Sequence, residues 1–211
     1  MENPVNGSEL GLLMPTAEDS QWFIIFEFSE SGYIKDDDRD DLDADAMIKS
    51  IREGTKQSNE ERRRRGWSTM EIVGWEVPPK YNTETKNLEW AIRGENEGDP
   101  VVNFNTRILG RRGVMEANLV IDPSVLQDAL PEFRTLLAGF DFVDGQRYSD
   151  FRQGDKIAKY GLAALVTGGA AAVALKSGLL QKLLKPIIIG LLAIGAIFKK
   201  FFRGGRTSTS E

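Results

Sequence analysis

Polar side chains alternate with apolar ones along several extended segments in the middle of the chain, and together they could line one face of a sheet. Carboxylates, amides and guanidinium groups on such a face could bind a small ligand, or catalyse hydrolysis if one carboxylate has a perturbed pKa. The same pattern is typical of the solvated face of a sheet that is buried on one side only, which is the commoner case. The candidate residues are Glu89, Arg93, Asn103, Asn105, Arg107, Glu116 and Asn118.

The residue types that are missing limit the chemistry further. The chain of 211 residues contains no cysteine and no histidine, which excludes disulfides, thiol nucleophiles, zinc sites built from Cys and His, and histidine general bases. Any catalytic site would have to use carboxylates, Lys, Tyr, Ser or Thr. We therefore favour a protein without enzymatic activity and expect no cofactor.

A run of aspartates raises the question of a metal site. Asp36, Asp38 and Asp40 have the alternate spacing of calcium ligands. An EF-hand loop starting at Asp36 would also need Gly at its sixth position and Glu at its twelfth, and the chain has neither. We interpret these acids as residues that precede a helix and complement its dipole, as the arginine run 62–65 would at the other end, and we expect no metal.

The hydrophobic pattern predicts the elements that would position these side chains. The apolar segment 22–28 is typical of a buried central strand, and Asp43 can cap a helix spanning about 44 to 65. Further strands are predicted at "MEIVGWEV" and "NLEWAIR", and Pro123 begins another helix. This order favours an α+β fold, with an antiparallel sheet of about five strands and helices packed on one side.

The segment around "GRRG" predicts a hairpin whose register follows from side-chain alternation. If Leu109 faces Val114, apolar residues meet apolar ones and polar residues meet polar ones across the two strands, as a fixed register requires. The predicted pairs are Ile108 with Met115, Phe104 with Leu119, Arg107 with Glu116, and Asn105 with Asn118.

Charge divides the chain into an acidic body and a basic tail. Residues 146–211 carry 11 Lys+Arg against 3 Asp+Glu, a net charge of +8, which leaves −13 for residues 1–145 within the total of −5. An acidic body argues against nucleic acid as a partner and favours a basic protein. We predict an N-terminal extension (1–20), an acidic α+β domain (21–150), a basic membrane anchor (151–206) and a polar tail (207–211).

Two apolar runs in the tail, residues 160–175 and 186–198, predict a helical membrane hairpin. Lysines near the ends of the second run could reach the headgroups and extend its span. The alternative is a buried or amphipathic helix pair in a soluble fold, but a soluble surface helix would show a polar face, which neither run has. Ala164, Gly168 and Ala172 lie four residues apart, so they could pack the two arms together or join two copies of the chain in the bilayer.

Four segments resemble a known family. "GYIKDDD", "GWEVPPKYNTETKNLEWAIRG", "VVNFNTRILGRRGVMEANLVI" and "LLAGFDFVDGQRYSDFRQGDKIAKYGLAALVTGGAAA" are similar, in this order, to the bacterial membrane-anchored proteins grouped as domain of unknown function 2167. The resemblance covers about residues 10 to 202 and implies an envelope-associated protein held by C-terminal membrane helices, with no established activity. Members usually carry a signal peptide and a further N-terminal region, whereas this chain resembles the family from near its middle onward.

The sequence leaves the side of the membrane open. Basic residues at the two outer ends of the hairpin outnumber those in the connection between its arms, 8 against 3, which favours both ends in the cytoplasm. A removed signal peptide would instead place the α+β domain outside. The resulting hypothesis is a non-enzymatic interaction or scaffold module at the bacterial inner membrane, and the alternative is a hydrolase or small-ligand-binding domain that uses the polar sheet face.

Overall fold

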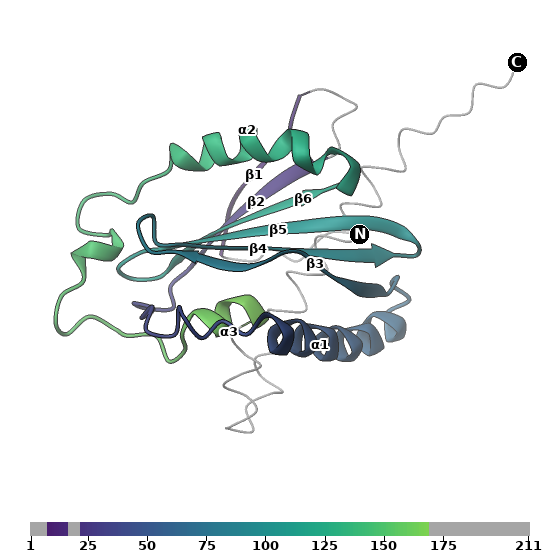
Figure 1. The fold of residues 1–211 in the computed structure, drawn as a ribbon, viewed down its shortest axis with the longest axis horizontal. Helices are drawn as coiled ribbons and strands as arrows, with labels where there is room; N and C mark the ends of the chain where they lie inside the picture. Colours follow the sequence, from purple (N-terminus) through teal and green to yellow (C-terminus); the bar gives the residue numbers. More distant parts are fainter. Residues whose placement is uncertain (1–7, 17–21, 169–211) are drawn as a thin grey trace, which may run out of the picture.

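The computed structural model describes residues 8–16 and 22–168, which form a six-stranded antiparallel sheet with three helices (Figure 1). The strand order is β1-β2-β6-β5-β4-β3, so β3 to β6 form a meander of neighbouring hairpins and β2 adds to β6. The strands are β1 (Glu9–Leu13), β2 (Trp22–Ser29), β3 (Met70–Asn82), β4 (Asn87–Asn96), β5 (Asp99–Leu109) and β6 (Val114–Ile121). The helices are α1 (Ala44–Arg64), α2 (Leu126–Ala138) and α3 (Leu162–Thr167), with short 3-10 turns at Pro123–Val125 and Tyr148–Asp150.

The predicted α+β class is confirmed, but the sheet is covered on both faces. On one face, α2 packs its Leu130 against Phe104 of the sheet. On the opposite face, Met47 of α1 and Leu162 of α3 pack with Trp90. Figure 1 shows α1 and α3 on the side of the sheet away from α2. The prediction of helices on one side only is therefore wrong, because the central strands turn apolar side chains to both faces and each face needs its own cover.

The sheet gains its sixth strand from the segment predicted as an N-terminal extension. β1 pairs antiparallel with β2, with a bulge between Glu9 and Gly11, and forms one edge of the sheet. β2 lies between β1 and β6, and its neighbouring residues Phe23 and Ile24 are buried in two different core clusters. Successive side chains in a strand point to opposite faces, so the two-sided apolar pattern of β2 reflects burial on both sides.

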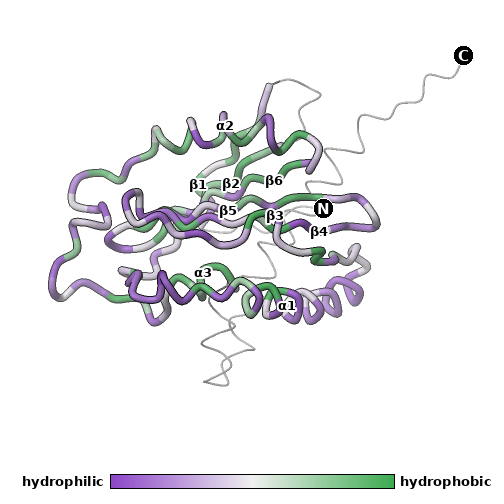
Figure 2. The backbone as a smooth tube through the Cα atoms, viewed as in Figure 1, coloured by the Kyte–Doolittle hydropathy of each residue, from purple (hydrophilic) through white to green (hydrophobic). Residues whose placement is uncertain are grey.

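The first helix begins and ends where its capping residues predict. The Asp43 carboxylate accepts a hydrogen bond from the backbone N–H of Ala46 at 2.9 Å, as an N-cap does. Leu42 and Met47 lie in the same core cluster, and the chain turns away after the helix through a left-handed Gly66 (φ 68°). Most of α1 is hydrophilic (Figure 2), so a narrow apolar stripe holds it to the sheet.

The β5–β6 hairpin has the predicted register. Its cross-strand partners are Ile108 with Met115, Arg107 with Glu116, Asn105 with Asn118, Phe104 with Leu119, and Leu109 with Val114. A shift by one residue would turn every side chain to the other face, so burial of Phe104 and Leu119 in the α2 cluster holds the register in place. Gly113 closes the turn, because a Cβ at this position would collide with the carbonyl oxygen of Ser29.

The opposite edge strand, β3, is irregular, and its alternating residues Val73, Trp75 and Val77 do not share one apolar face. Three register shifts interrupt its pairing with β4. Trp75 packs in the α1 cluster, Val77 packs in the α2 cluster, and Val73 is 45% exposed. Arg52 of α1 donates hydrogen bonds to backbone carbonyls of β3, one of them at Ile72, which occupies groups that a sheet edge otherwise leaves open.

The first apolar run of the tail begins inside this body. Leu162 and Val166 of α3 are buried with α1 and the sheet. The prediction that a membrane arm spans residues 160–175 is therefore wrong at its start, and the body continues past the predicted boundary at residue 150, because the second sheet face needs apolar cover. Within the described part of the chain, every helix is too short or too polar to cross a bilayer. The second run, 186–198, lies outside the described residues.

We expect Phe104→Ala to destabilise the fold strongly. Phe104 is fully buried, and its ring meets that of Phe133 on α2 edge to face, with centroids 5.7 Å apart. Removing a buried Phe ring typically lowers the free energy of unfolding by about 3 to 5 kcal/mol. Urea unfolding in mild detergent, followed by tryptophan fluorescence, measures the change. The control Val73→Ala, at a half-exposed position, should cost about 0.5 kcal/mol or less; equal losses in the two variants would contradict this core.

Candidate functional site

Five of the seven predicted polar residues share one face of the sheet. Asn105 lies opposite Trp90 of β4 in the ladder, and residues opposite one another point to the same face. Trp90 packs in the cluster formed with α1 and α3, so this is the face on which those helices lie. Asn103 lies opposite Ile92, which packs against the same cluster. The other four residues are Asn105, Arg107, Glu116 and Asn118, which the β5–β6 register places side by side.

Glu89 and Arg93 lie on the opposite face, toward α2. Glu89 approaches the Arg134 guanidinium of α2 at 3.9 Å, and Arg93, four residues further along the same strand, shares its face. Arg93 forms an ion pair with Glu76 of β3 at 2.7 Å. The structure therefore does not bring the seven predicted residues onto one face, because the β4–β5 register sets Glu89 opposite Thr106.

The residues on the α1 side bond mainly to one another. Arg107 donates a hydrogen bond to the side-chain oxygen of Asn118 at 2.7 Å and lies 3.0 Å from the Glu116 carboxylate. Asn118 donates in turn to Glu27 of β2 at 3.3 Å, and the Arg107 guanidinium lies 4.9 Å from the centroid of the Trp90 ring. Arg107 and Asn118 are both buried. This polar network links β2, β5 and β6, and its internal pairing supports a structural role.

Glu27 also belongs to this network, although the strand pattern did not predict it as a candidate residue. Burial of Glu27, together with the neighbouring carboxylate of Glu116, raises its pKa above the usual value. The two residues are direct partners across the β2–β6 ladder. The signal that could have identified Glu27 is its position as the single charge within "WFIIFEF". A raised carboxylate pKa is one property of a general acid, but here the surrounding polar groups are engaged in the network.

A second cluster joins the body to the C-terminal segment. The Asp36 carboxylate accepts hydrogen bonds from Tyr81 at 2.9 Å, Tyr148 at 3.1 Å and Lys86 at 3.3 Å. Burial raises the pKa of Asp36, but these three donors outweigh burial and hold its pKa below the usual value. Tyr148 stacks on Tyr33, with ring centroids 4.4 Å apart, and burial raises the pKa of Tyr148. At neutral pH Asp36 is therefore ionised and Tyr148 is protonated.

The neighbouring Asp38 caps the helix that the C-terminal segment contributes. Its carboxylate accepts hydrogen bonds from the backbone N–H groups of Leu162 at 3.0 Å and Ala163 at 3.1 Å. Glycine is required at residue 161, since a Cβ on Gly161 would lie 2.6 Å from this carboxylate. From the sequence alone, the aspartate run is expected to complement the dipole of α1. Instead, Asp36 and Asp38 bind the C-terminal segment, and no local pattern could have indicated partners so distant along the chain.

Two further contacts fasten residues 140–161, the segment between α2 and α3 that we call the strap. The Arg111 guanidinium donates two hydrogen bonds to the Asp155 carboxylate, at 2.7 and 2.8 Å, and this pairing lowers the pKa of Asp155 to about 2. The backbone of Tyr33 pairs in parallel with that of Ile157. The strap is therefore attached to the body through both side chains and main chain.

The small residues predicted to pack membrane helices do not form one helical stripe. Ala164 is buried within the body, and Gly168 ends α3 in a left-handed conformation (φ 85°). Ala172 lies outside the described residues. The prediction of a continuous helix face through all three residues is therefore wrong, because the helix stops at the second of them.

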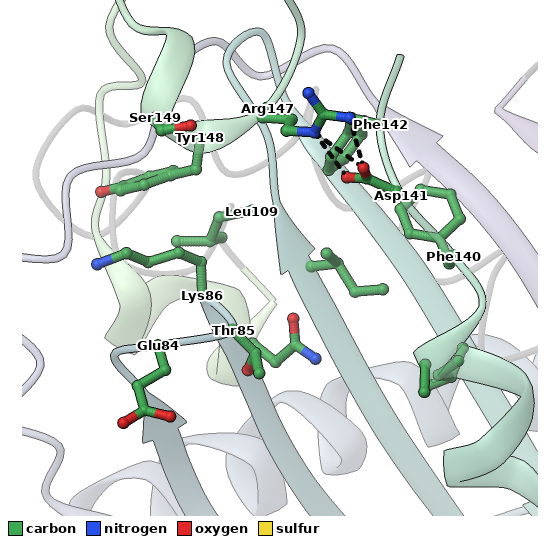
Figure 3. Close-up of a pocket in the computed structure, with 14 residues that line it drawn as sticks. Glu84, Thr85, Lys86, Leu109, Phe140, Asp141, Phe142, Arg147, Tyr148 and Ser149 are labelled. Atoms are coloured by element: carbon green, nitrogen blue, oxygen red, sulfur yellow. Dashed lines mark hydrogen bonds and ion pairs between the residues drawn. The ribbon is translucent and has the colours of Figure 1, made fainter. Parts of the chain in front are cut away.

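A cavity of about 370 Å³ opens where the strap meets the end of the sheet (Figure 3). The turn between β3 and β4 contributes Glu84 and Lys86 to its lining, and the end of β5 contributes Leu109. The strap contributes Phe140 and Arg147, which lie across the cavity from Glu84 in Figure 3. The cavity lining includes none of the seven residues predicted to form a polar site.

The comparison with protein families identifies the chain. Residues 1–198 match the family described as "Protein of unknown function (DUF2167)". This chain belongs to the DUF2167 family. The match confirms the resemblance noted in the sequence, and it carries no information on membrane anchoring. Among curated proteins, none matches the sequence.

A solved structure that resembles the DUF2167 chain is the solution structure of cyanobacterial PsbP (CyanoP) from Synechocystis sp. PCC 6803. The two chains are 11% identical, and the match covers 65% of this chain and 83% of that chain with a TM-score of 0.33. A likeness at this level supports no conclusion about the fold or the activity of the DUF2167 chain.

The described part of the DUF2167 chain contains no group of three or more His, Cys, Asp or Glu residues placed to hold a metal ion. In the aspartate run, the carboxylates of Asp36 and Asp38 instead accept hydrogen bonds from protein donors. Their geometry therefore suits attachment of the strap and the start of α3 better than coordination of calcium.

We expect Asp155 to make the stability of the DUF2167 chain depend on acid pH. Its pKa falls from an ordinary value of 3.8 to about 2 in the folded state. The contact with Arg111 therefore stabilises the fold above about pH 4, and the stabilisation is lost as the pH falls toward about 2. Thermal unfolding measured across this range should show Asp155→Asn well below the native midpoint near neutral pH, with the difference shrinking as the pH falls.

The partner residue provides the matched control for this prediction. Arg111→Met removes the same contact from the other side, so it should remove the same part of the acid dependence. The double variant should lose no more of that acid dependence than either single variant, since both changes break one interaction. Two results would contradict the predicted coupling between Asp155 and Arg111. One is an Asp155→Asn midpoint that depends on acid pH as the native midpoint does, and the other is a double variant in which the two losses add.

Proposed function

We propose that this DUF2167 chain is a membrane-tethered interaction module without catalytic activity, whose tether is the apolar C-terminal sequence. One observation carries the proposal: the segment that leads to that sequence is built into the core of the body. Leu162 and Val166 are buried, and α3 ends at Gly168, immediately before the apolar remainder of the first run. The junction between body and tether is therefore part of the fold rather than a loose linker.

The strap and α3 are fastened to the body up to Gly168, the last described residue before the apolar tail sequence. The contacts that hold them include Asp36 with Tyr148, Arg111 with Asp155, Tyr33 with Ile157, and Asp38 with the start of α3. A net hydrogen bond contributes about 1 kcal/mol, and more when one partner is charged, so the combined attachment resists local opening. A fixed exit would hold the body in one orientation at a bilayer, as a module that presents a defined surface requires.

The sequence beyond the body supports the tether. Thirteen consecutive uncharged residues lie between Lys185 and Lys199. A bilayer core needs about 20 residues of helix, and lysine side chains at both ends of the run could reach the headgroups and supply the difference. We place the protein at the bacterial inner membrane on this basis, and either side of the bilayer remains compatible with the charges.

The partner that fits this module is a basic protein. The body carries the acidic part of the chain, and aspartates around the start of α1 are exposed, among them Asp37, Asp40 and Asp45. An anionic leaflet would repel these side chains, so they would face away from the membrane and stay open to a basic surface. The internally bonded network around Arg107 supports an interaction role over hydrolysis, because its polar groups are engaged with one another.

We expect Ile194→Arg to release the protein from the membrane. A charged side chain at the middle of a spanning helix costs at least about 2.5 kcal/mol on insertion scales, whereas the control Ile194→Leu stays apolar. Alkaline carbonate washing of membranes, with immunoblots of pellet and supernatant, measures the release. The proposal would be wrong if a chain lacking residues 169–206 stayed in the washed pellet. It would also be wrong if the native chain were found in the supernatant.

Weakening the helix cap should loosen the strap without releasing the tether. Asp38→Asn removes the charge that faces the first N–H groups of α3, a loss of about 1 kcal/mol. Limited trypsin digestion, read by mass spectrometry, should then cut the strap faster, while carbonate washing leaves the protein in the pellet. The control Asp128→Asn, in the first turn of α2, should leave the digestion unchanged. Native cleavage rates in Asp38→Asn would argue against a cap that holds the strap.

A further inference from the structure

The cavity beside the strap has the size and the lining of a small-molecule site. Its volume of about 370 Å³ falls within the range of about 300 to 1,000 Å³ that is typical of ligand pockets. Apolar side chains from two elements line it, Ile108 from β5 and Leu137 from α2, and charged groups lie around them. The cavity forms because α2 ends before the sheet does, and the strap rather than a helix covers what remains (Figure 1).

One wall of the cavity is a rigid turn. The side chain of Asn82 accepts hydrogen bonds from the backbone N–H groups of Glu84 at 2.9 Å and Thr85 at 3.1 Å. Lys86 adopts a left-handed conformation (φ 59°), and its carbonyl accepts a hydrogen bond from the Leu109 N–H at 3.1 Å. The turn is therefore held in shape before any ligand arrives, which lowers the entropic cost of binding.

The opposite wall is held by one arginine. The Arg147 guanidinium donates hydrogen bonds to Asp141 at 2.6 and 2.8 Å (Figure 3). It also donates one to Asp144 at 2.8 Å. These bonds close the part of the strap that follows α2 into a compact loop. Both walls are thus preformed, and the space between them is not created by a mobile segment.

The charges around the cavity favour a cation over an anion. Lys86 is already paired with Asp36 at 3.3 Å, and Arg147 is paired with two aspartates of the strap. Glu84 is exposed, and among the described residues its carboxylate has no hydrogen-bond or ion-pair partner. An anionic ligand would have to displace an existing ion pair, whereas a cation would meet a carboxylate without a protein partner at the rim. In Figure 3 this carboxylate points out of the cavity, so the exposed Glu84 side chain turns inward to reach a bound cation.

Aromatic side chains supply the other half of a cation site. Phe140 and Phe142 meet edge to face with centroids 5.1 Å apart, and both line the cavity. The electron-rich face of such a ring attracts ammonium groups and also packs against apolar rings. At the same cavity the Lys86 ammonium lies 5.3 Å from the centroid of the Tyr148 ring, so this environment already places one cation against an aromatic ring.

We propose that this cavity binds a small organic cation, a primary ammonium group attached to an apolar ring. The ring packs against Ile108, Leu137 and Phe140, and the ammonium group binds the Glu84 carboxylate at the rim. The site is independent of the membrane tether and of the network around Arg107, because it shares no residues with either.

Three probes of one shape and different charge test the proposal: benzylamine, benzyl alcohol and benzoate. Each is titrated into the purified full chain in neutral detergent, and binding is followed by ligand-observed NMR. We expect benzylamine to bind about tenfold more tightly than benzoate, with benzyl alcohol between them, since one favourable charge contact in a partly screened site corresponds to about this factor. Benzoate binding as tightly as benzylamine, or no binding of benzylamine, overturns the proposal.

Two variants locate the site. Glu84→Gln should weaken benzylamine about threefold to fivefold and leave benzyl alcohol unchanged, because only the charge contact is lost. Ala138→Phe fills the cavity from an exposed position at the end of α2 and should abolish binding of both probes. The control Glu132→Gln makes the same charge change on an exposed part of α2 away from the cavity and should have no effect. Equal weakening in the two glutamine variants, or full binding in Ala138→Phe, rejects this cavity as the site.

Discussion

Burial of the sheet on both faces is the constraint from which the rest of the structure follows. The central strands turn apolar side chains both ways, with Phe104 and Leu119 toward α2 and Leu109 and Val114 toward α1 and α3. Helix α1 carries too narrow an apolar stripe to cover the second face alone. The chain therefore brings its C-terminal segment back beneath the sheet, and α3 completes the core there, although its sequence is apolar enough to have suggested a membrane arm.

This return of the chain explains the acidic residues that precede α1. Asp36 gathers hydroxyl and ammonium donors from the sheet and the strap, while Asp38 offers its carboxylate to the free N–H groups at the start of α3. Gly161 leaves room for that carboxylate. These groups lie close together in the folded protein but are far apart in the sequence. The aspartate run before α1 therefore serves as the attachment point for the segment that leads toward the proposed tether.

The polar groups of the body divide into those already paired and those still open. Around Arg107 a buried cation, two carboxylates and an amide bond to one another, so the network consolidates three strands. At the end of the sheet, beyond α2, the strap and a rigid turn leave a lined space with one open carboxylate at Glu84. Chemistry available to a ligand therefore lies where helices stop covering the sheet, which is not where the alternating polar residues of the strands suggested.

The sequence by itself determined the features whose signals are local. Asp43 starts α1 because its carboxylate reaches only the N–H groups just ahead, and the β5–β6 register follows from period-two alternation across a short turn, which also placed four candidate polar residues side by side. The tertiary structure alone decided that Glu89 faces α2, since the β4–β5 register sets its partner, and that helices lie on both faces. Only the tertiary structure shows that Asp36 and Asp38 bind partners 112 and 124 residues away. Such contacts depend on the path of the whole chain, and they produce no periodic pattern in the sequence.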